Sequence, residues 1–167
     1  HDNEITYSFV CSKEDIGEPE GVLVSYRLIC AFLIRFYESL GIKAQFALET
    51  KDFSKKKSPS EFCSASFEKY DIIINRRKIG GNAQKRARQA IFQHGSVPIS
   101  INWDMARKYL KSFPEGAPDS ATFLSRELNF SLERSTLEEK LIKAFADEFA
   151  VVFSEEGAYL YEAVMAE

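Results

Sequence analysis

The chain has 167 residues, 45% hydrophobic and 28% charged, which is the size and composition of one globular domain. Its 22 basic and 25 acidic residues leave a net charge of −3 at pH 7, which gives no reason to expect a nucleic-acid partner. No apolar run reaches the roughly 18 residues of a membrane span, so we expect no membrane partner either.

The first third of the chain predicts a strand followed by a long helix. Residues 5–11 are rich in β-branched and aromatic side chains, as strands are. Residues 12–21 hold two glycines and a proline and predict a loop. A helix is then predicted from Val22 to Leu40, ending before Gly41. Its apolar stripe, with spacings of three and four, consists of Val22, Tyr26, Ile29, Leu33, Phe36 and Leu40.

The middle of the chain predicts short strands. They span residues 43–49, 70–75, 77–84, 89–93 and 97–101. The segments 77–84 and 89–93 fit either two strands or one bent pair. Because proline cannot donate a ladder hydrogen bond, Pro98 predicts that its strand lies at the edge of a sheet.

The last third predicts helices. Two short helices, at 103–110 and 121–128, flank a loop at 113–120. The pattern Ser135-Thr136-Leu137-Glu138 predicts a capping box that opens a helix running to about Phe149, and Ser154 predicts the cap of a final helix. The expected fold class is therefore α+β, a mixed β-sheet with helices packed against it.

The cysteines indicate a reducing compartment. Cys11, Cys30 and Cys63 are too few for a disulfide framework, and their number is odd. We therefore expect all three to be reduced thiols and the protein to be cytoplasmic. No Cys/His cluster has metal-ligand spacing, so we expect no metal site. The abrupt start at His1 and the end at Glu167 predict that residues 1–167 are one catalytic-type domain, incomplete at both termini.

Candidate reactive groups gather between residues 63 and 98. Cys63 follows a polar, proline-containing loop, where a thiol can be exposed; it fits either a nucleophile or a structural thiol. Strand alternation would place Lys78, Gly80 and Asn82 on one face, and a lysine beside glycines can hold a carbonyl or carboxylate group. A surface lysine on a half-exposed strand is the alternative. His94 fits either a structural or a catalytic role.

These residues, in this order, resemble a known family. The stretch Arg77-Lys78-Ile79-Gly80-Gly81-Asn82-Ala83-Gln84, followed by Gln93-His94-Gly95-Ser96, is similar to motifs of the lipoate-protein ligase/octanoyltransferase family, which has the biotin/lipoate ligase fold. The opening residues 1–8 resemble the end of another motif of that family. Cys63 lies seven residues before Tyr70, the spacing found in the cysteine-dependent branch.

The resemblance implies transfer of an octanoyl or lipoyl group onto a lysine of a lipoyl-carrier domain. Cys63 would form the acyl thioester and Lys78 would stabilise charge on the acyl carbonyl, with no cofactor required. The substrate-binding residues implied are Asp71, Gly80, Gly81, Asn82, Ala83, His94 and Gly95. The implied partners are acyl carrier protein as donor and, as acceptor, glycine cleavage H protein or the E2 component of a 2-oxoacid dehydrogenase.

Two alternatives stay open within this resemblance. An ATP-dependent lipoate ligase would use ATP and Mg, with Asp71 and Lys78 contacting an acyl-adenylate. A non-catalytic family member would only bind acyl groups or carrier domains. The sequence departs from the family pattern at Arg76, where glycine is common, and at Ser64, where phenylalanine is common. The family's Arg-Arg and glycine-rich loop is absent from the 167 residues.

Overall fold

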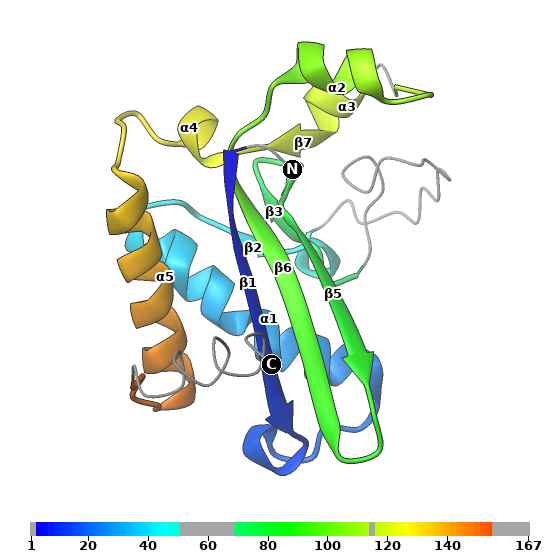
Figure 1. Ribbon diagram of the computed structural model, residues 1–167, viewed down its shortest axis with the longest axis vertical. Coiled ribbons are helices and arrows are strands. Elements are labelled where there is room, and N and C mark those ends of the chain that lie inside the picture. Colours follow the sequence, from blue (N-terminus) through cyan, green and yellow to red (C-terminus); the bar gives the residue numbers. More distant parts are fainter. Residues whose placement is uncertain (1–2, 51–68, 114–115, 155–167) are drawn as a thin grey trace, which may run out of the picture.

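The computed structural model describes residues 3–50, 69–113 and 116–154, which form two β-sheets with helices (Figure 1). The strands are β1 (Asn3–Ser12), β2 (Gln45–Phe46), β3 (Ile72–Ile74), β4 (Arg77–Ile79), β5 (Gly81–Arg86), β6 (Ala90–Ser100) and β7 (Ala121–Thr122). The α-helices are α1 (Gly21–Ser39), α2 (Trp103–Tyr109), α3 (Ala117–Ser120), α4 (Leu124–Glu127) and α5 (Arg134–Phe149), and the 3₁₀ turns are η1 (Glu14–Ile16) and η2 (Ala47–Glu49).

The first sheet has three antiparallel strands in the order β1-β6-β5. Side chains alternate between its two faces because successive residues of a strand point in opposite directions. The inner face, against which α1 lies, includes the buried residues Ile5, Ile91 and Val97. On the outer face, Val10 and Phe92 are exposed. Figure 1 shows this sheet standing in front of α1.

The second sheet has four short strands in the order β2-β3-β4-β7. β4 and β7 pair in parallel and the other neighbours are antiparallel, so this sheet is mixed. Ile72, Ile73 and Ile74 are all buried, as expected for a strand that is covered on both faces.

The core joins α1 to α5 and the first sheet through aromatic rings. The Phe32 ring lies 5.1 Å from the rings of both Tyr7 and Phe145, and the Phe145 ring lies 4.6 Å from that of Phe149. Pairs at such distances add roughly 0.5–1.5 kcal/mol each beyond their buried area. These ring contacts pack the two long helices against each other and against β1.

The predicted fold class, α+β with a mixed sheet, is confirmed, although the strands divide into two sheets. The long helix is also confirmed, but its predicted stripe is wrong at the start, because Val22 is 52% exposed. Ile29, Leu33 and Phe36 are buried as expected. No helix within the described residues is long and apolar enough to cross a membrane.

Several strand predictions are wrong. The segment predicted at 43–49 forms only the two-residue β2 followed by η2, and the segments predicted at 89–93 and 97–101 belong to one strand, β6. Residues 77–84 are not one strand, because Gly80 has φ +68° and separates β4 of the second sheet from β5 of the first. The strand containing Pro98 is not an edge: it is the end of β6, the central strand. Pro98 is accommodated because β5 pairs with β6 only as far as Ser96, and the register with β1 shifts between Asn3 and Glu4.

The helical region also differs from expectation. Residues 121–128 form the short strand β7 and then α4. α5 begins at Arg134, with no side-chain cap on the preceding Glu133, so the predicted capping box is wrong. An ion pair of 2.8 Å between Arg134 Nε and Glu138 Oε1 ties the first turn instead. The helix predicted after Ser154 lies outside the described residues.

Replacing Leu137 tests how α5 is held. Leu137 is 1% exposed, so Leu137→Ala should lower the free energy of unfolding by about 2–5 kcal/mol. Ile142 on the same helix is 52% exposed, and Ile142→Ala should change it by less than about 0.5 kcal/mol. Urea unfolding measures both; equal losses would contradict the described packing of α5.

Candidate active site

A buried ion pair joins Asp71 and Lys78. Asp71 immediately precedes β3 and Lys78 lies opposite Ile73 in the β3–β4 hairpin. Lys78 Nζ lies 2.9 Å from Asp71 Oδ2, and the two side chains are only 8% and 6% exposed. Lys78 is therefore not a solvated surface lysine. Removing one charge of such a pair typically costs about 3–5 kcal/mol, because the other charge stays buried.

Gly80 permits the sharp passage from β4 into β5. A Cβ atom at this position would lie 2.1 Å from the Ser96 carbonyl oxygen of β6. Together with the positive φ, this makes glycine a packing requirement at residue 80. The predicted alternation of Lys78, Gly80 and Asn82 through one strand is wrong for the same reason.

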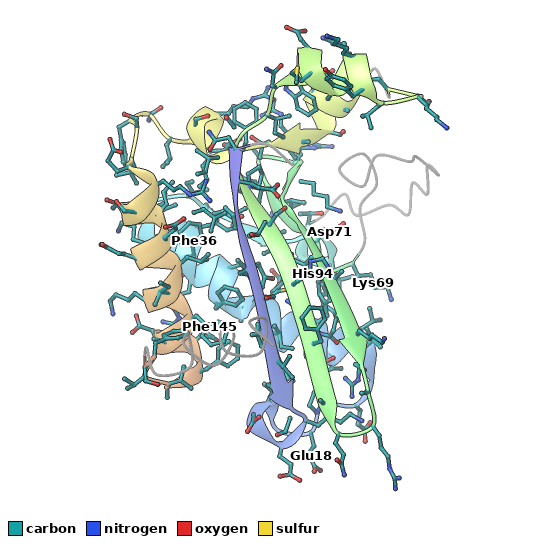
Figure 2. All side chains as sticks on the ribbon, viewed as in Figure 1. Glu18, Phe36, Lys69, Asp71, His94 and Phe145 are labelled. Atoms are coloured by element: carbon teal, nitrogen blue, oxygen red, sulfur yellow. The ribbon has the colours of Figure 1, made fainter. Side chains whose placement is uncertain are left out.

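Gly81, Ala83 and His94 lie together on the open outer face of the first sheet. A Cβ atom built on Gly81 meets nothing within 4 Å. Ala83 and His94 are direct cross-strand partners, and both are exposed. The His94 ring stacks on Phe92 with centroids 5.8 Å apart. We call Gly81, Ala83 and His94 the outer strip; Figure 2 labels His94 on the sheet, together with Asp71.

Asn82 and Gly95 lie on the opposite, inner face. The Tyr7 hydroxyl donates to Asn82 Oδ1 over 2.6 Å, and the Tyr26 hydroxyl donates to the Asn82 carbonyl oxygen over 3.1 Å. A Cβ on Gly95 would lie 2.1 Å from Asn82 Oδ1. The predicted substrate-binding residues of this sheet thus divide between its two faces, while Asp71 adjoins the second sheet and Gly80 lies in the turn between the sheets.

The sequence reasoning missed the polar groups of this inner face. Gln93 is fully buried, and its Nε2 donates to the Tyr7 hydroxyl over 3.1 Å and to Cys30 Sγ over 3.2 Å. Gln84 Nε2 donates to Gln93 Oε1 over 2.9 Å. The sequence does contain a signal for Gln93. It lies an even number of residues from the apolar Ile91 and Val97, so alternation along the strand places it on the same inward face.

Neither cysteine in the described part of the chain is suited to be a nucleophile. Burial raises the pKa of the Cys30 thiol to about 12, although the hydrogen bond from Gln93 acts in the opposite direction. Burial and the nearby Asp15 raise the pKa of the Cys11 thiol as well. Cys11 lies near the end of β1, opposite Ile91. Cys63 lies outside the described residues.

Lys69 and Asp71 are held to η2 by backbone hydrogen bonds. Lys69 accepts a backbone hydrogen bond from Leu48 over 2.9 Å, and Asp71 accepts one from Ala47 over 2.8 Å. The Tyr70 ring packs against Phe46 at 5.8 Å. Residues 69–71 are therefore hydrogen-bonded to η2, which ends one residue before Thr50.

No group of three or more metal-ligating side chains occurs among the described residues. Asp71 and Lys78 are the predicted residues that could contact a phosphate or its magnesium ion. A groove of about 540 Å³ lies between α1 and the segment that includes β2 and η2. Its lining includes Val24, Leu28 and Phe46. Because none of the predicted site residues lines it, we do not assign the chemistry to this groove.

The chain matches a protein family over residues 1–146. The family is described as the lipoyl protein ligase A/B catalytic domain. Among curated proteins, the chain is 33% identical over 153 residues to octanoyltransferase LipM of Bacillus anthracis, covering 87% of this chain and 55% of that protein. The chain thus spans about half the length of the curated relatives it matches.

Solved structures share the fold at lower identity. Protein Ta0514 from T. acidophilum with bound lipoic acid has a TM-score of 0.67 at 19% identity, covering 92% of this chain and 54% of that chain. Lipoate-protein ligase A bound with ATP has a TM-score of 0.66 at 19% identity, covering 91% and 54%. A bi-partite lipoate protein ligase with its E2 lipoyl domain, from Thermoplasma acidophilum, has a TM-score of 0.63 at 18% identity, covering 92% and 54%.

The predicted fold family is confirmed by these matches and by a more distant one. A biotin protein ligase from Aquifex aeolicus in complex with biotin and ATP has a TM-score of 0.54 at 12% identity, covering 89% of this chain and 50% of that chain.

The same substitution should destabilise the protein at Gly80 but not at the adjacent Gly81. Gly80→Ala should lower the free energy of unfolding by about 2–4 kcal/mol, because it adds left-handed strain and a clash with Ser96. Gly81→Ala should change it by less than about 0.5 kcal/mol, because its Cβ enters open space. Thermal unfolding of the two variants measures the difference; equal effects would contradict the described β4–β5 turn.

Cys30 should be unreactive in the folded protein. Its pKa of about 12, against an ordinary value of 9.0, keeps it protonated at pH 8 and lowers its thiolate fraction by about a thousandfold. Iodoacetamide labelling mapped by mass spectrometry should therefore modify Cys30 in urea but not in buffer. The labelling in buffer should stay low as the pH rises to 9. Rapid labelling of Cys30 in the folded state would contradict its described burial.

Proposed function

The chain belongs to the lipoyl protein ligase A/B catalytic domain family, and from this premise we propose that the protein is an octanoyltransferase. It would move an octanoyl group from acyl carrier protein to a lysine of a lipoyl-carrier domain through a thioester on Cys63. The observation that carries the proposal is the buried Lys78–Asp71 ion pair, whose lysine lies on β4, just before the turn at Gly80 that leads into the open outer strip. The match to LipM over 87% of the chain supports this choice of reaction within the family.

The proposed chemistry has two balanced steps. The Cys63 thiolate attacks the thioester carbonyl of the octanoyl donor, and the C–S bond to the carrier breaks, releasing the carrier thiol. The amine of the acceptor lysine then attacks the carbonyl of the Cys63 thioester, and the bond between this carbonyl and Cys63 Sγ breaks. An amide forms, and the proton lost by the amine restores the Cys63 thiol. Because an amide is more stable than a thioester, the reaction needs neither ATP nor a metal.

Cys63 is proposed as the nucleophile on two grounds. Its spacing from Tyr70 is that of the cysteine-dependent branch, and the other two cysteines have raised pKa values, which disfavour the thiolate. In the sequence, Cys63 lies eight residues before Asp71, whose backbone is hydrogen-bonded to η2. Cys63 is therefore connected by a short stretch of chain to the charged pair that we assign to the site.

Lys78 would supply positive charge to the acyl carbonyl in the transition state. Asp71 fixes the Lys78 ammonium group at 2.9 Å, so that the charge is held in place before substrate arrives. Gly81, Ala83 and His94 would form one wall of the acyl site. Gly80, Asn82 and Gly95, also predicted to bind substrate, would instead shape that wall from behind.

The proposed partners follow from the reaction. Acyl carrier protein would donate the acyl group, and glycine cleavage H protein or an E2 lipoyl domain would accept it. The solved bi-partite lipoate protein ligase with its E2 lipoyl domain supports an acceptor of this kind. The reaction needs a free thiol, so we propose that the protein works in the cytoplasm, where thiols stay reduced.

An ATP-dependent lipoate ligase is the second candidate. It is favoured by the shared fold with lipoate-protein ligase A bound with ATP. In this reaction the Lys78 ammonium would contact the phosphate of a lipoyl-adenylate and Asp71 would hold the lysine or a magnesium ion. Cys63 would then have no covalent role.

Formation of an octanoyl thioester on Cys63 distinguishes the proposed octanoyltransferase from the alternatives. The full-length protein, mixed with octanoyl-acyl carrier protein, should gain one octanoyl group by intact mass spectrometry, and hydroxylamine should remove it. Cys63→Ser should lose this adduct, and Cys11→Ser, the matched control, should keep it. Transfer to a lipoyl domain should proceed without ATP.

Any of three results would overturn the octanoyltransferase proposal. The first is full transfer activity in Cys63→Ser. The second is lipoate-dependent release of pyrophosphate from ATP by a protein that forms no octanoyl adduct, which would establish the ligase instead. A folded protein that binds octanoyl-acyl carrier protein but transfers nothing would establish the non-catalytic alternative.

A further inference from the structure

Two tyrosines from different elements hold one asparagine of β5. Tyr7 comes from β1 and donates to Asn82 Oδ1 over 2.6 Å. Tyr26 comes from α1 and donates to the Asn82 carbonyl oxygen over 3.1 Å. The side chain and the backbone of Asn82 are thus both fixed. We call Tyr7, Tyr26 and Asn82 the Asn82 clamp.

A buried glutamine fixes the direction of one of these bonds. Gln93 Nε2 donates to the Tyr7 hydroxyl oxygen over 3.1 Å, so the Tyr7 proton is free to point at Asn82. Gln93 is itself held, because its Oε1 accepts from Gln84 over 2.9 Å. Among the described residues no buried side-chain polar atom lacks a partner. A fully satisfied network of this kind holds a single arrangement of side chains.

Gly95 leaves the space that the clamp needs. A Cβ at residue 95 would lie 2.1 Å from Asn82 Oδ1 and 2.8 Å from Tyr7 Cε1. Any side chain there would push Asn82 away from Tyr7. The glycine opposite Asn82 in the β5–β6 pair therefore serves the clamp.

The clamp acts directly behind the outer strip. Asn82 lies between Gly81 and Ala83, and its cross-strand partner Gly95 follows His94. Because successive residues of a strand point to opposite faces, a contact that fixes Asn82 from the inner face also fixes the residues beside it on the outer face. The same segment is joined to Lys78 through the turn at Gly80.

We propose that Tyr7 and Tyr26 are positioning residues, which hold Asn82 so that the outer strip keeps the shape that selects an eight-carbon acyl chain. This inference rests on the proposed function, since it assumes that the outer strip is a wall of the acyl site. Neither tyrosine contacts the acyl group in this account. Both act through the strand on which Gly81 and Ala83 lie.

The two phenols remain donors under all assay conditions. Burial, together with the nearby Cys30, raises the pKa of Tyr7 and of Tyr26 well above the usual value of about 10. The clamp therefore does not titrate at neutral or mildly alkaline pH. Its contribution to selectivity should be the same from pH 6 to pH 9.

Removing each hydroxyl tests the clamp with little change in packing. Tyr7→Phe and Tyr26→Phe in the full-length protein should each lower kcat/KM for an octanoyl donor by about threefold to tenfold, the effect of one net hydrogen bond. The ratio of kcat/KM for octanoyl over decanoyl donors should fall by a similar factor. Tyr109→Phe is the matched control, because Tyr109 is 68% exposed and lies on α2; it should change neither value.

Hydrogen exchange provides a readout that does not depend on activity. The amides of residues 81–84 should exchange faster in both variants than in the wild type and in Tyr109→Phe. The double variant should show less than the product of the two single effects, because both tyrosines act through Asn82. If one variant does not fold, the other still tests the proposal.

The outcomes separate this inference from the function on which it rests. A wild-type protein that forms no octanoyl thioester overturns the proposed function, and with it the selectivity role. An active wild type, with variants that keep its octanoyl-to-decanoyl ratio, overturns the positioning role alone. Equal loss of activity toward both donors overturns it too, because it would mean a general loss of structure.

Discussion

The pairing of β6 with strands on both sides is the constraint on which this structure depends. β6 is hydrogen-bonded to β1 and to β5, so the direction of each of its side chains is fixed by its position in the strand. Gln93 and Gly95 must face α1, and Phe92 and His94 must face outward. A shift of one residue in this register would bury His94 and expose Gln93. The polar inner network and the open outer strip are two consequences of the same register.

The passage from β4 to β5 links the two sheets and places charge next to the strip. Gly80 makes this turn against the Ser96 carbonyl, and no other residue fits that space. On one side of the turn, Lys78 is buried and paired with Asp71; on the other side, Gly81 opens to the outer face. A buried ion pair is weak support for stability, because desolvation offsets much of the attraction. In the proposed reaction, the pair would instead serve to hold a cation in one place.

The sequence predicts the composition of this site better than its geometry. Periodicity identifies the long helix and the first strand, because each has one buried face. It fails at Gly80, where a single positive φ moves the chain from one sheet to the other, and alternation cannot be counted across such a break. It fails again at Pro98, which sits in a central strand because its neighbour β5 has already ended. The resemblance finds Asn82 and Gly95 by motif, but only the three-dimensional pairing separates them from Gly81, Ala83 and His94.

α1 contacts different parts of the molecule at its two ends: β5 near its N-terminus, and the core with α5 in its second half. Near its N-terminus, Ser25 donates to Gln84 Oε1 over 2.7 Å and Arg86 donates to the Gly21 carbonyl oxygen over 2.7 Å, so this end is tied to β5 by directional bonds. In its second half, Phe32 and Phe36 are buried in the core, and Arg35 Nε donates to Glu148 Oε2 of α5 over 2.9 Å. The N-terminal bonds place β5, and the contacts of the second half hold α1 to the core and to α5. The N-terminal end of α1 lies behind the strip that we assign to the acyl group. Because α1 is anchored in the core and hydrogen-bonded to β5, it fixes the position of this strand, which carries Gly81 and Ala83.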